Sequence, residues 1–156
     1  MLILYIKRID LKNFRNYKET NIELGEGVNV FYGRNAQGKT NIIESVYMAS
    51  TGKSHRTQKD MELIRWNSED ARIRIDYERE EEERIEIYLN KRIKKQIRKN
   101  GVRISKIGEL IGNLNTVIFS PDHMKIIKEG PVERRRFIDI ILSQVKPGYY
   151  IILFST

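Results

Sequence analysis

The chain has 156 residues, a length typical of one domain and sufficient for a substantial core. It carries 29 Lys and Arg residues against 21 Asp and Glu, a net charge of +8, which favours a polyanionic partner, although surplus surface lysines would give the same value. No apolar run has the length of a membrane span, and the N-terminus lacks the basic start and the cleavage site of a signal peptide. The absence of Cys excludes disulfides and cysteine-bound zinc and is compatible with a cytoplasmic protein.

The first predicted elements are two strands joined by a turn. Residues 2–12 alternate incompletely between apolar and polar side chains, with a break near Lys7 and Arg8. Residues 13–17 form a turn that contains two aromatic side chains, and residues 21–24 resemble a second strand. The sequence therefore predicts an antiparallel pair at the start of the chain.

Residues 33–40 fit the phosphate-binding pattern G-x-x-x-x-G-K-[ST] without a gap. The two glycines of this P-loop let the backbone turn tightly, so that successive N–H groups point inward at a polyphosphate. The lysine places a positive charge against the β- and γ-phosphates, and the threonine hydroxyl can ligate Mg²⁺. The predicted nucleotide-binding residues are Gly33, Arg34, Asn35, Ala36, Gln37, Gly38, Lys39 and Thr40, with Thr40 as the Mg²⁺ ligand.

The context of the P-loop supports a nucleotide site. Val28, Val30 and Phe31 predict a buried strand before the loop, and residues 41–50 predict a helix after it, ending at Gly52 as a C-cap. Strand, loop and helix thus follow in the required order. Two antiparallel strands ahead of a P-loop are unusual for small nucleotide kinases and GTPases, and suit the ATPase heads of the ABC superfamily better.

The polar loop after this helix contains an arginine whose role the residues leave open. Arg56 is a second phosphate contact, an arginine that reaches a neighbouring subunit's nucleotide, or an ordinary surface residue. The sequence around His55 shows no nucleophile or metal-ligand pattern, and His55 is not expected to be catalytic. Trp66 is expected to anchor a local core.

A strongly basic hairpin is predicted in the middle of the chain. Residues 71–79 and 84–89 alternate and predict one hairpin with a solvated face. Residues 91–103 then hold seven basic residues and no acidic one, and Asn100-Gly101 favours a type I′ turn. This ribbon either lies along a DNA backbone or is a solubilising sheet edge. The DNA-binding candidates are Lys91, Arg92, Lys94, Lys95, Arg98, Lys99 and Arg103.

Two further helices and a strand are predicted toward the C-terminus. Residues 105–111 favour a short helix with Ser105 as its N-cap, and residues 116–119 favour a buried strand. Asp122 is interpreted as a helix cap rather than a metal ligand. Residues 131–145 have the periodicity of an amphipathic helix.

The start of this last helix and the residues after it carry two more signals. Arg134–Arg136 oppose the helix dipole, which suggests an acidic or phosphate partner. The chain ends in the apolar run YYIILFST, which favours a chain that stops partway through a longer protein.

Several motifs together resemble the RecF family, bacterial recombination mediators of the ABC/SMC-like ATPases. The P-loop alone is shared by many functions, whereas the FSPD segment and the GPVERRRFID run are much more specific. The matching segments are residues 11–17, 33–41, 54–56, 60–65, 119–122 and 130–139.

The resemblance implies the N-terminal part of an ABC/SMC-type α/β P-loop ATPase head. In this fold antiparallel strands and hairpins lie beside a P-loop strand–helix unit, with a helical segment toward the C-terminus. It implies a cytoplasmic ATP-dependent homodimer with Mg²⁺ that binds double-stranded and gapped DNA. Such a protein supports recombinase loading with recombination mediator proteins in DNA repair, replication and the SOS response. Carried over by position, Arg15 is an additional nucleotide contact.

The chain also departs from the family's full pattern. It contains neither the signature Ser-Gly motif nor an apolar run ending in paired acids, so the slow ATPase activity expected of the full-length dimer should be negligible here. Turnover that Lys39→Ala abolishes would contradict this expectation. We expect residues 1–120 to form a P-loop lobe with the basic hairpin, and residues 121–156 to begin a truncated helical lobe.

Four alternatives differ from this interpretation. Another ABC/SMC-type DNA-repair head would share most of these motifs. A GTPase should carry the guanine motif N-K-x-D, but the nearest match, residues 90–93, lacks the acid, and no lid-like set of arginines indicates a nucleotide kinase. A basic binding module with a vestigial P-loop would show no affinity for nucleotide that depends on Lys39.

Overall fold

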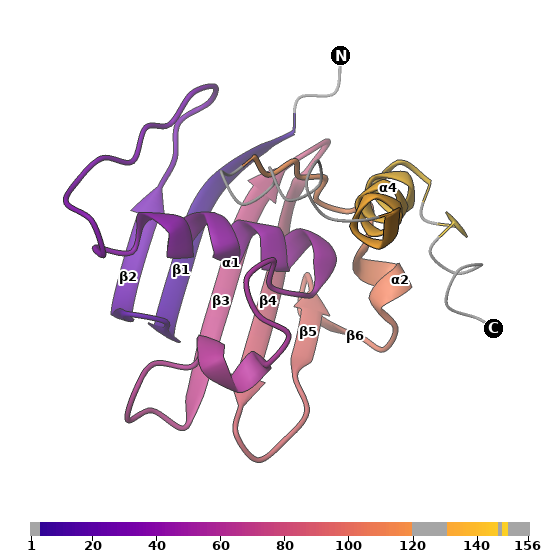
Figure 1. Ribbon diagram of the computed structural model, residues 1–156. Coiled ribbons are helices and arrows are strands. Elements are labelled where there is room, and N and C mark those ends of the chain that lie inside the picture. The colour runs from indigo at the N-terminus through magenta and orange to yellow at the C-terminus, as the bar shows by residue number, and fades with distance from the viewer. Residues whose placement is uncertain (1–3, 120–130, 147, 150–156) are drawn as a thin grey trace.

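The structure is a computed structural model that describes residues 4–119, 131–146 and 148–149. Its body is one six-stranded antiparallel sheet with the strand order β2-β1-β3-β4-β5-β6, and helix α1 crosses one face of this sheet (Figure 1). The strands are β1 (Tyr5–Phe14), β2 (Tyr17–Glu23), β3 (Asp70–Glu78), β4 (Glu82–Asn90), β5 (Gln96–Lys99) and β6 (Val102–Ile104). The helices are α1 (Lys39–Thr51), the 3₁₀ helix η1 (Asp60–Leu63), α2 (Ile107–Leu110) and α4 (Pro131–Val145).

The three predicted strand pairs form, each through a local connection. β1 and β2 pair around the turn between Phe14 and Tyr17, and β3 pairs with β4 across the turn at residues 79–81. The irregularity expected near Lys7 is a register shift in the β1–β3 pairing between Ile6 and Arg8. β5 and β6 meet at Asn100 and Gly101, whose φ values of 50° and 82° are both positive, as a type I′ turn requires.

The core lies between the sheet and α1. Ile73, Ile75 and Tyr77 of β3 are fully buried on one face, while the charged residues between them line the other. Met48 and Ala49 of α1 are buried against this apolar layer. The predicted helix after the P-loop is confirmed, and it ends at Gly52, which has a φ of 73°. A Cβ on Gly52 would lie 2.8 Å from the Ile107 side chain, so this C-cap also allows α2 to approach closely.

Two predicted buried strands are wrong. Residues 28–32 and 116–119 have no strand structure, and Val28, Val117 and Phe119 are each 90% exposed. A strand needs a neighbour to satisfy its backbone N–H and C=O groups, and in the part of the chain that the structure describes no strand pairs with either segment.

Two smaller predictions are also wrong. Trp66 is 85% exposed and anchors no core, because it lies in a surface turn between η1 and β3. The N-cap of α2 is Lys106 and not Ser105, and no side chain caps this helix. The backbone N–H of Ser105 is instead within hydrogen-bonding distance of the Glu109 carboxylate, at 3.3 Å.

Helix α4 is confirmed and stands at the β6 end of the sheet, beside α2 (Figure 1). It is tied to the body by Gln144, whose side-chain oxygen accepts from the Thr116 N–H at 2.7 Å, while the Thr116 hydroxyl lies 2.5 Å from that of Ser50 in α1. Much of its predicted apolar face remains half-exposed, including Phe137 and Leu142. Asp122 and most of the apolar C-terminal run lie outside the described residues. Within those residues no helix is long and apolar enough to cross a membrane.

Candidate nucleotide-binding site

The P-loop has the backbone conformation of a phosphate-binding turn. Gly33, Ala36 and Gly38 have φ values of 148°, 63° and 102°, which turn the chain back on itself before α1 begins. Gly38 is the N-cap of α1 and is buried. A Cβ there would come within 2.7 Å of the Asn16 side chain and 2.8 Å of the Tyr17 ring, so only glycine lets the loop sit against the β1–β2 turn.

Lys39 and Thr40 occupy the first turn of α1, where backbone N–H groups have no partner within the helix. The Lys39 ammonium donates to the carbonyl oxygens of Gly33 and Arg34, both at 2.6 Å, so it spans the loop from its end to its start. Thr40 is exposed beside it. A positive charge, unpaired amides and a hydroxyl therefore meet at the positive end of the helix dipole.

A pocket of about 410 Å³ opens at this place. Its lining joins the P-loop to an arginine that lies more than fifteen residues further along the chain. The lining residues are Asn35, Ala36, Gln37, Gly38, Lys39, Thr40, Asn41 and Arg56. Six of the eight residues predicted from the motif thus surround one cavity, and Arg56, whose role was open, belongs to the same cavity.

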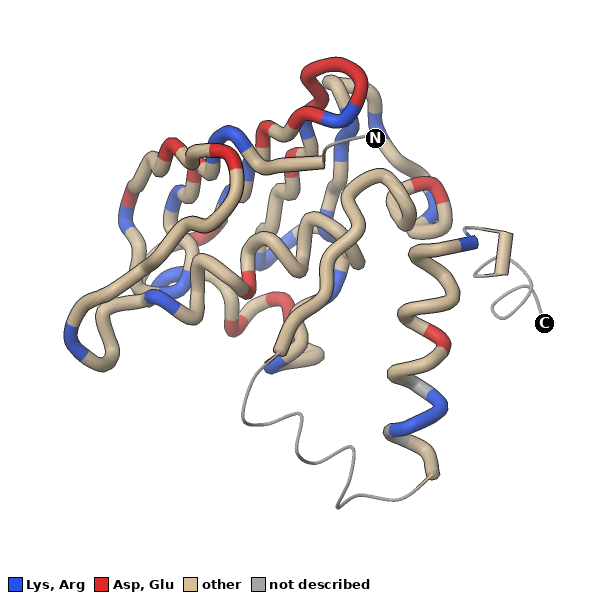
Figure 2. The backbone as a smooth tube through the Cα atoms, turned by 90° about the horizontal axis from the view of Figure 1, so that it is seen from above, with Lys and Arg blue, Asp and Glu red and all other residues tan. Residues whose placement is uncertain are grey.

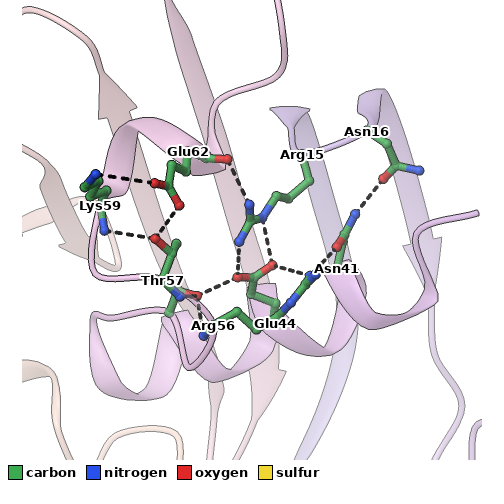
Figure 3. A network of polar contacts seen from close by, with 9 residues as sticks. Arg15, Asn16, Asn41, Glu44, Arg56, Thr57, Lys59 and Glu62 are labelled. Atoms are coloured by element: carbon green, nitrogen blue, oxygen red, sulfur yellow. Dashed lines mark hydrogen bonds and ion pairs between the residues drawn. The ribbon is translucent and has the colours of Figure 1, made fainter. Parts of the chain in front are cut away.

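Arg56 is held in the pocket wall by two acceptors. Its Nη1 donates to the Asn41 side-chain oxygen at 2.8 Å and to Glu44 Oε2 at 3.3 Å. Asn41, the first residue after the P-loop motif, donates in turn to the Asn16 side-chain oxygen at 2.8 Å. The β1–β2 turn, the start of α1 and the loop around Arg56 are therefore linked by polar contacts (Figure 3).

Glu44 is the centre of these contacts, and sequence reasoning missed it. Its side chain is fully buried, and Arg15 donates to its two oxygens from Nε at 3.0 Å and from Nη2 at 2.7 Å. The Ser54 hydroxyl donates to Oε1 at 2.5 Å. The sequence did contain a signal: Glu44 is the one charged residue between Thr40 and Gly52, and an acid that is buried in a helix requires charged partners.

The surroundings of Glu44 keep its carboxylate ionised. Burial alone would raise its pKa, because a low dielectric disfavours the charged form. The hydrogen bonds from Arg15 and Ser54, together with the charges of Arg15 and Arg56, outweigh that cost and leave the pKa below its ordinary value. Glu44 is therefore a fixed negative charge under physiological conditions.

Arg15 has a second structural attachment. Its Nη1 donates to the Glu62 carbonyl oxygen at 2.9 Å, and its own N–H donates to the Leu63 carbonyl oxygen at 2.7 Å. Its φ of 53° is unusual for a residue with a side chain. These contacts attach Arg15, in the β1–β2 turn, to α1 and η1. Its role as a nucleotide contact stays a prediction.

Several basic side chains of the hairpin at residues 91–103 form ion pairs with acidic residues. Figure 2 shows Lys and Arg residues along the strands and on α4 with Asp and Glu between them. Lys91 and Arg92 share Glu69, at 3.5 and 3.7 Å. Lys95 lies 2.9 Å from Asp60, and Lys99 lies 2.9 Å from Glu83. The candidates without an ion pair among the described residues are Lys94, Arg98 and Arg103.

Of these three residues, the two arginines face each other. The β5–β6 register places Arg98 directly opposite Arg103, and both are exposed. Glu86 of β4 lies opposite Arg98 on its other side and balances one of the two charges. Like charges directly opposite each other in a sheet oppose folding, so this pair is a local surplus of positive charge.

The described residues form no cluster of metal ligands. Among the residues that the structure describes, no group of three or more His, Cys, Asp and Glu side chains is arranged to hold a metal ion. Thr40 as a Mg²⁺ ligand stays a prediction; in nucleotide sites Mg²⁺ is commonly held by one or two protein oxygens together with the phosphates.

Comparison with protein families gives one domain match. Residues 8–148 match the family described as AAA domain. Among curated proteins, the DNA replication and repair protein RecF of Clostridium tetani is 52% identical over 148 residues, and that of Acetivibrio thermocellus is 51% identical. Each alignment covers 94% of this chain and 40% of the relative. The chain thus spans well under half the length of these relatives.

Solved structures give the same result for the fold. The recombination mediator protein RecF-ATP of the RecFOR pathway superposes with a TM-score of 0.93 at 37% identity, over 99% of this chain and 43% of that one. A structure from work on ATP-driven dimerization and DNA-stimulated activation of SMC ATPases has a TM-score of 0.68 at 26% identity, over 88% of this chain and 99% of that one. The predicted fold class, the N-terminal part of an ABC/SMC-type ATPase head, is confirmed.

Proposed function

The chain belongs to the AAA domain family and corresponds to the N-terminal portion of RecF-type proteins, and from this premise we propose that it is the ATP-binding part of a DNA repair and replication protein. The observation that carries the proposal is the pocket in which Lys39, Thr40 and Arg56 meet at the start of α1. Three phosphates carry several negative charges, and this pocket offers two cations and the end of a helix dipole.

Each residue of the pocket has a separate task in nucleotide binding. The P-loop amides and Lys39 would bind the β- and γ-phosphates. Thr40 would hold Mg²⁺, which when bound neutralises phosphate charge. Arg56 would add a second cation to the polyphosphate. The remaining predicted residues, Gly33 and Arg34, hold Lys39 through their carbonyl oxygens.

A thermal melt with and without Mg²⁺-ATP tests this site. A ligand at about 100 times its Kd adds roughly 2.7 kcal/mol of stability, which for a chain of this size is a shift in Tm of about 5–10 °C. We expect that shift for the parent chain and none for Lys39→Ala. The shifts are compared, and not the absolute Tm values, because Lys39→Ala also removes two hydrogen bonds to the loop. An equal shift in both proteins, or none in the parent, would contradict the proposed site.

Binding of double-stranded or gapped DNA is the second part of the proposal. The surplus positive charge at Arg98 and Arg103 supports it, since a phosphate backbone would relieve the repulsion between two facing arginines. The exposed Arg134 and Arg135 near the start of α4 provide further positive charge. Lys91, Arg92, Lys95 and Lys99 would contribute less, because each already faces a carboxylate.

The names of the relatives support the wider part of the proposal. A RecF-type protein in the RecFOR pathway would act with recombination mediator proteins, and ATP would close a homodimer in the way that dimerization of SMC ATPases is ATP-driven. We expect the protein to be cytoplasmic and to serve the SOS response. Residues 1–120 and 121–156 would belong to a P-loop lobe and a helical lobe, with slow ATP turnover confined to the complete dimer.

A further inference from the structure

We infer that Glu44 is a positioning residue for nucleotide binding: it holds Arg56 in the pocket, so that the contribution of Arg56 to binding depends on Glu44. The inference rests on the proposed nucleotide site and adds to it a residue that lines no part of the pocket. Its evidence is the set of contacts that converge on the Glu44 carboxylate.

A buried carboxylate of this kind needs an explanation. Glu44 lies on the helix that follows the P-loop, one turn after Lys39 and Thr40. An apolar residue would fill the same volume without the cost of burying a charge. Arg15 already neutralises Glu44 with a bidentate contact, which is enough to satisfy the carboxylate. A second arginine is therefore more than the stability of Glu44 requires.

The second arginine faces the pocket. Arg56 lines the cavity and its side chain is 42% exposed, whereas the side chain of Arg15 is 19% exposed. Both side-chain contacts of Arg56 use Nη1, so the other guanidinium nitrogens make no hydrogen bond to any residue that the structure describes. A guanidinium held at one nitrogen presents the rest of its planar fork to a ligand, and phosphate oxygens match this fork.

The charges of the cluster explain how the arrangement works. Two guanidinium groups and one carboxylate leave a net charge of +1, carried by the exposed arginine beside Lys39. Without Glu44, two arginines would repel each other, and Arg56 would keep only its neutral contact with Asn41. Arg56 would then be free to leave the pocket, and its binding to phosphate would carry a larger entropic cost.

A double-mutant cycle tests the inference. The Kd for Mg²⁺-ATP is measured for the parent, Glu44→Gln, Arg56→Ala and the double variant. We expect each single variant to weaken ATP binding by about tenfold, and the double variant to be weaker than either single one by no more than about twofold. Glu62→Gln is the matched control: the Glu62 carboxylate contacts Thr57 in the same loop but does not touch Arg56. It should leave the Kd unchanged.

A merely structural role for Glu44 predicts a different result. In one such result, Glu44→Gln lowers Tm and leaves the Kd for Mg²⁺-ATP unchanged. In another, the loss of affinity in the double variant is the product of the two single losses. Either result overturns the inference. If Glu44→Gln does not fold, Glu44→Asp replaces it, because it keeps the charge and shortens the reach. Arg56→Ala should then have a smaller effect in the Glu44→Asp background than in the parent; an equal effect overturns the inference.

Lys39→Ala distinguishes a failure of the proposed nucleotide site from a failure of the positioning role of Glu44. If the parent binds no ATP in a manner that depends on Lys39, the proposed nucleotide site fails and the role of Glu44 fails with it. If binding depends on Lys39 but is unchanged in Glu44→Gln, only the positioning role is overturned.

Discussion

Glu44 shows how one side chain can serve both stability and a site. Its carboxylate joins the β1–β2 turn, α1 and the loop after α1, since Arg15, Arg56 and Ser54 all donate to it. Removing one member of a buried, paired cluster of this kind typically costs about 3–5 kcal/mol, because an uncompensated charge remains. The same contacts that stabilise the fold therefore set the geometry of the pocket wall.

The pH dependence of stability should show this residue directly. The folded-state pKa of Glu44 is below its ordinary value, so the residue stabilises the fold above the unfolded pKa of about 4.3. That contribution is lost as the pH falls through the folded pKa. We expect Tm to fall more steeply in the parent than in Glu44→Gln between roughly pH 5 and pH 3, measured by circular dichroism at each pH.

Comparing the parent with Glu44→Gln cancels the contribution of the other acidic residues to the pH dependence of Tm. The pKa values of Asp76 and Glu83 are also lowered, because their hydrogen bonds to charged or polar partners outweigh the effect of burial. These surroundings are the same in the parent and in Glu44→Gln, so both acids contribute equally to the two curves. Two parallel curves of Tm against pH would mean that Glu44 has the same pKa in the folded and the unfolded chain.

The β5–β6 hairpin shows at the level of an element how a local signal determines structure. Gly101 has a φ of 82°, and a Cβ at this position would meet no atom within 4 Å. Gly101→Ala therefore tests backbone strain alone, and it should destabilise the chain by about 1–2 kcal/mol, which lowers Tm by a few degrees. Gly25→Ala is the matched control, since Gly25 also meets open space and is not in the left-handed region. It should leave Tm unchanged or slightly raised.

The elements that were predicted correctly share this local character. The β3–β4 alternation, the Asn100-Gly101 turn and the helix ending at Gly52 depend on neighbouring residues, which the sequence displays. Residues 28–32 and 116–119 have equally good strand patterns, but a strand also depends on a partner that no local pattern identifies. The wrong predictions are therefore those that needed information about tertiary structure.

The candidate site also has a part that local sequence predicts and a part that depends on tertiary structure. The backbone turn of the P-loop could be predicted, because the spacing of the motif encodes that conformation, whereas nucleotide binding by its residues stays a prediction. The approach of Asn16 and Tyr17 to Gly38, and the convergence of Arg15 and Arg56 on Glu44, join parts of the chain that are far apart in sequence. Sequence reasoning identified the two arginines but not the carboxylate between them.

At the scale of the whole molecule, the distribution of ion pairs predicts which basic residues would contact DNA in the proposed function. Each phosphate contact contributes about 0.9 to the slope of log K against log salt on duplex DNA. We expect Arg98→Ala combined with Arg103→Ala to lower that slope by about 1.8, measured by fluorescence anisotropy over a series of salt concentrations. Lys99→Ala should change it little, because Lys99 is held by Glu83 at 2.9 Å and donates to Asn113 at 2.6 Å.

Lys99 is the matched control in this experiment because it lies on the same short strand as Arg98. An equal loss of slope in both variants would show that net charge, and not particular free residues, determines binding. An unchanged slope in the double variant would place the contact elsewhere, with Arg134 and Arg135 as the next candidates.

The exposed segment 28–32 leads directly into the P-loop, so hydrogen exchange of its backbone amides can report on the state of this part of the chain. Backbone amides in β3 are locked in a central strand and should exchange with deuterium only on global unfolding, whereas those of Val30, Phe31 and Tyr32 belong to no ladder in the described chain and should exchange within seconds. Any strand that came to pair with this segment would slow their exchange and at the same time stiffen the backbone that enters the phosphate loop. Slower deuterium uptake at these few positions would thus report, in one peptide, that a strand has paired with this segment and that the backbone leading into the P-loop has become more rigid.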